Sequence, residues 1–345
     1  MSMNYETIIN ICERTGRVTL EHVQEVLERL YAETEETGDA IEQYCKIDTL
    51  IEQVFTAKTL IGNSSSYHNV AVVLARNEAF DYACDILELG IKKSATSVDL
   101  LADYLNYGCR CNRQEKCDAF FAELCARQDT WNWRAYQFAI NYLLEIENYG
   151  SKCDVHKIND LVKAFLTEIP EREEAYLSKA EWLKKMPQSE RISLWGEETY
   201  ESVLKDVTDG KYRLKRTPKC DLNLADYYYS MGINFMESFN LLERCKKDSI
   251  EIQASINRTY VYLLSALCKM SIYYEKVKDY DSKRAGDNSE LQAIAHDVYE
   301  QFHFASLDAS DLYVRNCRQL IELFVCETEE PYPYGDGIEN RIVSL

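Results

Sequence analysis

A spacing of bulky and small side chains recurs five times along the chain. In each copy a bulky residue is followed three positions later by a variable residue, four positions later by a small residue and seven positions later by another bulky one. Positions three, four and seven residues apart share one face of an α-helix, so the spacing predicts helices that pack closely at the small residue. The copies are Tyr67/Val70/Ala71/Leu74, Tyr104/Tyr107/Gly108/Cys111, Ala135/Phe138/Ala139/Tyr142, Tyr176/Lys179/Ala180/Leu183 and Tyr228/Met231/Gly232/Phe235.

A second helix is expected to follow each of these helices. Downstream of the first copy, Ala83 and Gly90 lie seven residues apart and are predicted to face the first helix. Ala119 and Ala126 lie 36 residues further along and predict the same contact in the second copy. The repeating unit is then a helix hairpin of roughly 34 to 40 residues, which must stack on a copy of itself to bury its apolar face.

These hairpins resemble the tetratricopeptide repeat family, whose pattern is Trp-x2-Leu-Gly-x2-Tyr, then Ala-x3-Phe, then Pro. The resemblance extends over about residues 64 to 185 and resumes from about 221 to 270. Tyrosine or alanine replaces the tryptophan, and Lys179 stands where an apolar residue is expected. The resemblance implies an all-α fold: a right-handed superhelical array of antiparallel helix hairpins, or TPR-like α-solenoid. Its concave face would be lined by the first helix of each pair and would bind an extended or helical partner segment.

The resemblance also implies where a partner would bind. The candidates follow the leading bulky residue of each copy, and most of them are polar but uncharged. They are His68, Asn69, Asn106, Gln137, Ser178, Tyr229 and Ser230, with Asn112 and Lys184 further along. Family members that bind chaperone tails hold a carboxylate with lysines and asparagines, and this chain lacks that set. We therefore predict no receptor for chaperone tails, and the alternative for each position is a side chain that only faces solvent.

The sequence predicts five parts. They are an N-terminal helical capping region (1–62), TPR-like repeats (63–204), a basic connecting loop (205–220), C-terminal helical repeats (221–327) and an acidic tail (328–345). The basic loop carries Lys211, Arg213, Lys215, Arg216 and Lys219. It is either a solvated connection or a docking site for an acidic surface, which could belong to a partner or to the rest of this chain.

The whole chain is strongly acidic. Its 39 basic and 58 acidic side chains give a net charge of −19. Such a charge opposes binding to a nucleic-acid backbone or to an anionic membrane surface. We therefore expect a protein or peptide partner, and we expect neither nucleic acid nor a membrane.

The cysteines and the apolar runs bear on the cellular compartment. The 13 cysteines are scattered through apolar helical stretches, and the start MSMNYETIIN carries no export signal. The longest nearly apolar run, 259–274, contains Lys269 and is shorter than the roughly 20 residues of a membrane-spanning helix. We expect reduced thiols and a cytoplasmic protein.

No motif in the sequence establishes an enzymatic activity. The glycine-rich phosphate-binding loops and the His-Glu-x-x-His zinc motif are absent. Cys109, Cys111, Cys117 and Cys125 form the densest cysteine group, but their spacing departs from the paired C-x2-C of zinc sites. We therefore expect no cofactor and no metal.

One catalytic pattern remains. Arg17 and His22 fit the Arg-x4–6-His motif of the HEPN ribonucleases, in which a dimer brings two such motifs together. There the arginine would hold a phosphate and the histidine would transfer protons. Val18 stands where a polar residue is usual, and about one chance match is expected in a chain of this length.

These observations favour a non-enzymatic scaffold or regulatory subunit that binds a partner protein or peptide in a solenoid groove. Two alternatives stay open. One is a peptide-sensing regulator, similar to the bacterial family that joins N-terminal output helices to tetratricopeptide repeats. The other is a HEPN-like ribonuclease.

Overall fold

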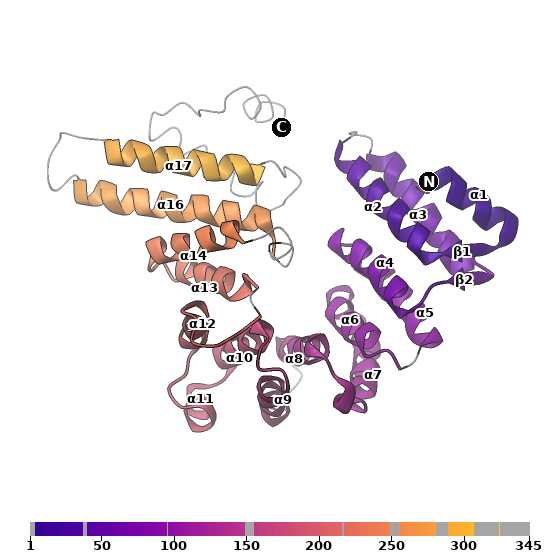
Figure 1. Cartoon of the computed structure of the whole chain (residues 1–345), viewed down its shortest axis with the longest axis horizontal. Coiled ribbons are helices and arrows are strands. Elements are labelled where there is room, and N and C mark those ends of the chain that lie inside the picture. The colour runs from indigo at the N-terminus through magenta and orange to yellow at the C-terminus, as the bar shows by residue number, and fades with distance from the viewer. Residues whose placement is uncertain are drawn as a thin grey trace. The chain divides into compact units, whose positions relative to one another are not determined.

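The computed structural model describes residues 4–36, 40–94, 96–148, 155–215, 217–248, 253, 256–280, 289–306 and 324. The chain divides into two compact units, unit 1 (Met1–Ile169) and unit 2 (Pro170–Leu345). Within the described residues both units are built almost entirely of helices (Figure 1). The acidic tail and Arg216 lie outside the described residues.

Unit 1 contains a series of helices joined by short connections. They are α1 (Tyr5–Thr15), α2 (Leu20–Glu36), α3 (Ala40–Thr56), α4 (Ser64–Arg76), α5 (Phe80–Lys93), α6 (Val98–Gly108), α7 (Gln114–Cys125), α8 (Trp133–Asn148) and α9 (Val155–Glu168). The short 3-10 helices η1 (Cys109–Cys111) and η2 (Gln128–Thr130) follow α6 and α7. Helix α9 buries an apolar stripe of residues at helical spacing, Ile158, Leu161, Val162 and Phe165.

The helices of unit 1 pack as hairpins, α2 with α3, α4 with α5, α6 with α7 and α8 with α9 (Figure 1). The first helix of each hairpin also packs on the first helix of the next, α2 on α4, α4 on α6 and α6 on α8. We call α2, α4, α6 and α8 the first-helix row. Packing between nearest neighbours is typical of helical repeats. The expectation of an all-α fold built of helix hairpins is therefore confirmed.

Small residues allow these helices to approach one another. Ala71 and Ala139 are fully buried, as the repeat spacing predicts. A Cβ atom on Gly90 of α5 would lie 2.8 Å from Cγ of Tyr67 on α4, and one on Gly108 would lie 2.4 Å from Sγ of Cys117 on α7. Real Cβ atoms do not come so close to a neighbour, so only glycine fits at either position without a shift.

Two details of the predicted repeat are wrong. Ala119 and Ala126 are exposed, and α7 buries Phe121 and Leu124 instead. The fifth copy is also not a helical segment, because the preceding helix ends at Ser230 and Gly232 adopts a left-handed φ of 68° in the turn that follows. There the glycine serves the turn rather than a close approach of two helices.

A small sheet joins the ends of the first hairpin of unit 1. Helix α1 ends at Thr15, Gly16 follows with a left-handed φ of 64°, and the strand β1 (Arg17–Thr19) comes next. Strand β1 pairs in parallel with β2 (Thr59–Ile61), which follows α3. The sheet therefore holds the entrance of α2 next to the exit of α3.

Unit 2 is also helical. Its helices are α10 (Glu173–Lys185), α11 (Gln188–Trp195), α12 (Tyr200–Thr208), α13 (Lys219–Ser230), α14 (Phe235–Lys247), α16 (Arg258–Tyr280) and α17 (Ser289–Ser306). Helix α10 packs on α12, α13 on α14 and α16 on α17, while α10 also packs on α13 and α13 on α16. Unit 2 thus repeats the hairpin arrangement of unit 1, around a core in which Leu204, Leu224, Leu242 and Leu264 are almost fully buried.

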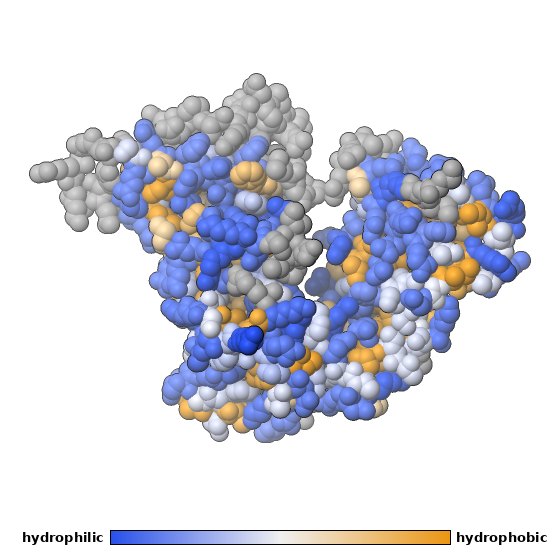
Figure 2. Space-filling model, viewed as in Figure 1, coloured by the Kyte–Doolittle hydropathy of each residue, from blue (hydrophilic) through white to orange (hydrophobic). Residues whose placement is uncertain are grey.

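The surfaces of the two units are mostly polar. Figure 2 shows hydrophilic residues over much of the visible face of each unit, with hydrophobic residues in scattered patches. The exposed large apolar side chains of unit 2 include Met231, Ile233 and Met236, around the turn between α13 and α14. None of the helices in the described part of the chain combines the length and the apolar composition that a membrane span requires.

Candidate functional site

A buried carboxylate lies at the centre of the first-helix row. Asp103 belongs to α6, and its side chain is 0% exposed in the apolar stretch from Leu100 to Leu105. Its Oδ2 lies 2.6 Å from Nδ1 of His68, and its Oδ1 accepts a hydrogen bond from the Arg134 guanidinium. Burying a carboxylate is costly unless it is paired and hydrogen-bonded, and both partners are present here.

The partners of Asp103 come from the two neighbouring helices of the row, His68 from α4 and Arg134 from α8. We call these three residues the triad. The His68 side chain is 24% exposed and the Arg134 side chain is 22% exposed. The His68 imidazole and the Arg134 guanidinium therefore both contact Asp103, while each side chain stays partly exposed to solvent.

One turn beyond the triad, polar and aromatic side chains continue along the same helices. Asn106 and Tyr107 follow Asp103 by three and four residues, and Gln137 and Phe138 follow Arg134 in the same way. All four side chains are half-buried. We call the triad, these four residues and the exposed Asn69 of α4 the row face.

Several arginines lie around Tyr107. Burial raises the pKa of the Tyr107 phenol to about 12, and the negative charge of Asp103 adds to the rise. The positive charges of Arg134, Arg110 and Arg76 act in the opposite direction. Positive charge therefore lies close to Tyr107, although the chain as a whole carries a net charge of −19.

The structure places the predicted partner-binding residues of unit 1 as follows. His68 belongs to the triad, and Asn69, Asn106 and Gln137 lie on the row face. Asn112 lies apart from them, because it follows η1 with a left-handed φ of 56° in the connection to α7. Four of the five therefore lie on α4, α6 and α8, which are successive members of the first-helix row.

The predicted residues of unit 2 have different surroundings. Ser178 is only 3% exposed and is part of the packing of α10. Lys184 is exposed, with its Nζ 4.9 Å from the centre of the Tyr200 ring. Tyr229 is half-buried, and Ser230, at the end of α13, donates a hydrogen bond to the carbonyl oxygen of Tyr227 at 2.9 Å.

The basic segment before α13 folds against the acidic start of α10. The backbone N–H groups of Thr217 and Cys220 each donate to the Glu173 carboxylate at 2.7 Å, and Nζ of Lys219 lies 3.2 Å from Glu174. Burial raises the pKa of Glu173, while the two N–H donors oppose the rise. Glu173 therefore caps α13 from another helix.

Among the described residues of this segment, Lys211, Arg213 and Lys215 are basic and exposed. Nζ of Lys211 lies 2.5 Å from Oδ2 of Asp206. The backbone of Lys215 forms a parallel bridge with Arg172, and its N–H donates to the carbonyl oxygen of Glu171 at 2.6 Å. The segment is therefore anchored through its backbone, while the side chains of Arg213 and Lys215 face solvent.

The sequence analysis missed Asp103 and Arg134. Each immediately precedes the first residue of its repeat copy, Tyr104 and Ala135, so the two occupy equivalent positions in successive hairpins. Opposite charges at equivalent positions of adjacent repeats are the signal that would have found them. The repeat spacing is defined only by bulky and small side chains, so it does not detect charged residues beside them.

The remaining motifs lie elsewhere. Arg17 is exposed on β1, and His22 is half-buried in the first turn of α2. In the described part of the chain, no three or more histidine, cysteine, aspartate or glutamate side chains are arranged so that they could hold a metal ion.

No family model matches the chain. No curated protein matches it. Among solved structures, the chain is similar to a monomeric mutant of IFIT1 with m7Gppp-AAAA, the cap in its anti conformation, at 12% sequence identity and a TM-score of 0.42. That likeness covers 88% of this chain and 65% of the IFIT1 chain. A TM-score of 0.42 defines neither a shared family nor a shared ligand.

Proposed function

We propose that the chain is a non-enzymatic scaffold or regulatory subunit that binds a partner protein or peptide on the row face of unit 1. The single observation that supports this proposal is the triad. Three consecutive first helices contribute to it, and a fully buried carboxylate contacts the partly exposed side chains of His68 and Arg134. A rigid array of donors has little conformational entropy to lose when a ligand binds.

The chemistry of the row face suits a peptide segment with acidic side chains. Asn69, Asn106 and Gln137 supply amides that both donate and accept hydrogen bonds, which matches a peptide backbone. Arg134, together with Arg110 and Arg76 around Tyr107, supplies positive charge. Complementary charge contributes specificity and fast association.

The test compares two matched variants of the full chain. The face variant carries Asn69→Ala, Asn106→Ala and Gln137→Ala. The control variant carries Asn10→Ala, Asn240→Ala and Gln292→Ala, which remove two asparagines and one glutamine from exposed positions outside the row face. Each protein is used as bait in extracts of the native host, and the retained molecules are identified by mass spectrometry.

We expect the wild type and the control variant to retain a stoichiometric protein or peptide that the face variant does not retain. Once this partner is purified, its affinity for the face variant should be tenfold or more lower than for the wild type. Binding of that partner should weaken as salt is raised, because charge contributes to it. Equal retention by both variants would contradict the proposal, and so would recovery of RNA in place of a protein. If the retained molecule is a short peptide that raises the melting temperature of the protein, the regulatory subunit is a peptide-sensing regulator.

A further inference from the structure

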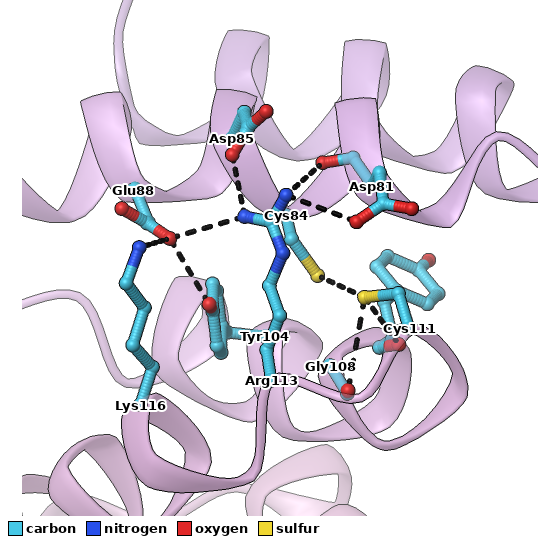
Figure 3. A network of polar contacts seen from close by, with 10 residues as sticks. Asp81, Cys84, Asp85, Glu88, Tyr104, Gly108, Cys111, Arg113 and Lys116 are labelled. Carbon is cyan, nitrogen blue, oxygen red and sulfur yellow. Dashed lines mark hydrogen bonds and ion pairs between the residues drawn. The ribbon is translucent and has the colours of Figure 1, made fainter.

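Two thiols from different elements face each other in unit 1. Sγ of Cys84, on α5, lies 3.6 Å from Sγ of Cys111, at the end of η1 (Figure 3). Both thiols are free, Cys84 is buried and Cys111 is half-buried. A disulfide bond is about 2.05 Å long, so the two sulfurs need to approach by only about 1.5 Å to be joined.

A network of ion pairs holds the turn that carries Cys111 against the helix that carries Cys84. Arg113 follows Cys111 by two residues and reaches across to α5, where its guanidinium pairs with Asp81 at 3.1 Å, with Glu88 at 3.2 Å and with Asp85 (Figure 3). The turn that carries Cys111 is therefore fixed against the helix that carries Cys84. Such clamping keeps the sulfurs close without a covalent bond.

We propose that Cys84 and Cys111 form a modification site, which a hydroperoxide such as hydrogen peroxide converts reversibly into a disulfide. This site is independent of the proposed partner binding, because its substrate is the oxidant itself. The half-buried Cys111 is the thiol that the oxidant reaches, and the buried Cys84 is the thiol that closes the bond.

The reaction balances in two steps. The Cys111 sulfur attacks one oxygen of hydrogen peroxide, the O–O bond breaks, and the products are a sulfenic acid on Cys111 and one water. The Cys84 sulfur then attacks the Cys111 sulfur, the S–O bond breaks, and the leaving hydroxide takes the Cys84 proton as a second water. Two thiols are oxidised by two electrons, and one peroxide is reduced to two waters.

The surroundings of the sulfurs agree with this order. Burial raises the pKa of the Cys111 thiol, but the hydrogen bond from Cys84 and the charge of Arg113 oppose the rise. Burial raises the pKa of Cys84 well above its usual range, and the neighbouring Cys111 raises it further. Cys111 is therefore the first of the pair to ionise, and Cys84 stays protonated until it attacks.

The test uses the full-length wild-type protein. The protein is treated with hydrogen peroxide, its remaining thiols are alkylated, and the digest is analysed by mass spectrometry. We expect one cross-linked peptide pair joining Cys84 to Cys111, with a loss of about 2 Da, and its disappearance after treatment with dithiothreitol. Cys45, an exposed thiol on α3, serves as the internal measure of oxidant exposure.

Two results would overturn the proposal. One is that Cys84 and Cys111 are both recovered as alkylated thiols after Cys45 has been fully oxidised. The other is a cross-linked peptide pair that joins Cys109 to Cys117, with no pair that joins Cys84 to Cys111.

A second measurement does not depend on peptide recovery. Because the bond would join residues 27 positions apart, it should stabilise unit 1 and raise its unfolding temperature by a few degrees. Cys111→Ser should abolish this rise, and Cys45→Ser should retain it. A rise that persists in Cys111→Ser would also overturn the proposal, and the wild-type cross-link decides the outcome if that variant does not fold.

Discussion

Asp103 is the residue on which the row face depends most. It is fully buried and serves both His68 and Arg134, so its removal leaves two donors without their acceptor. Breaking a buried ion pair typically costs about 3–5 kcal/mol, and the partial exposure of Arg134 lowers this to about 3 kcal/mol here. Asp103→Ala should therefore lower the free energy of unfolding by about 3 kcal/mol in urea denaturation followed by circular dichroism.

The matched control for this variant lies one turn earlier on the same helix. Asp99 is half-buried and accepts one hydrogen bond from Asn132 at 2.7 Å. Asp99→Ala should cost only about 1 kcal/mol, because a single hydrogen bond is lost at a hydrated site. Equal costs for the two variants would show that burial of Asp103 does not set its contribution.

Glu88 gives unit 1 a pH dependence. It accepts hydrogen bonds from Lys116 at 2.6 Å and from Tyr104 at 3.0 Å. Burial acts to raise the pKa of Glu88, but these bonds and the nearby positive charges outweigh burial and hold the pKa below its ordinary value. The ionised form therefore contributes stability above the unfolded-state pKa, and this contribution is lost as the pH falls through the folded-state pKa.

Glu88→Gln should accordingly destabilise the protein at about pH 7 and lose most of its effect by about pH 3. The measurement is urea denaturation of the variant and the wild type across this range. Glu115→Gln, at an exposed position of α7, is the control and should have little effect at any pH. A Glu88→Gln effect that grows on acidification would contradict the assigned direction.

The residue scale also shows where sequence analysis stops. The resemblance to tetratricopeptide repeats predicted His68, Asn69, Asn106 and Gln137 as partner-binding residues, and that role stays a prediction. It could not indicate that Asp103 is buried between His68 and Arg134. That contact joins residues 35 and 31 positions away in sequence, and its geometry depends on how neighbouring hairpins stack.

At the scale of elements, close packing of α6 against α7 depends on Gly108. A Cβ there would lie 2.4 Å from Sγ of Cys117 and 3.2 Å from Cε1 of Tyr104. Gly108→Ala should therefore destabilise unit 1 by about 1–3 kcal/mol despite the better helix propensity of alanine.

A double-mutant cycle tests whether the cysteine is the cause. Cys117→Ala removes the sulfur that the new Cβ would meet, so the double variant should be more stable than the sum of the two single changes predicts, by about 1 kcal/mol. Ala119→Gln, at an exposed position of the same helix, should change the free energy of unfolding by less than about 0.5 kcal/mol. Strict additivity at Gly108 and Cys117 would exclude this contact as the reason for the glycine.

The helices themselves could be predicted from sequence. Their ends, and the surfaces by which they pack on one another, could be predicted only in part. A stripe such as that of α9 is a local property, and burial of Ile158 and Phe165 follows from it. Glycine at the small position of a repeat copy, however, has different roles in different copies. Gly108 permits a close approach, whereas Gly232 forms a left-handed turn, and the surrounding spacing is identical. Only the conformation distinguishes them.

At the scale of the whole molecule, a large negative charge acts against the folded state. A net charge of −19 produces self-repulsion that is greater in compact units than in an unfolded chain. Ion pairs such as Arg113 with Asp81 and Lys269 with Asp297 oppose this repulsion. Because these pairs remain partly exposed, each contributes only about 0–1 kcal/mol. Salt screens both effects, and we expect the unbalanced charge to be the larger of the two.

Raising sodium chloride from about 20 mM to about 300 mM at neutral pH should therefore increase the melting temperature by a few degrees, because repulsion is screened more than attraction is lost. Scanning calorimetry measures this directly, and potassium chloride at equal ionic strength controls for a specific ion effect. The increase should shrink toward the sequence pI of about 4.8, where net repulsion vanishes. A melting temperature that falls with salt at neutral pH would mean that the ion pairs, and not the excess of carboxylates, dominate the electrostatics of the fold.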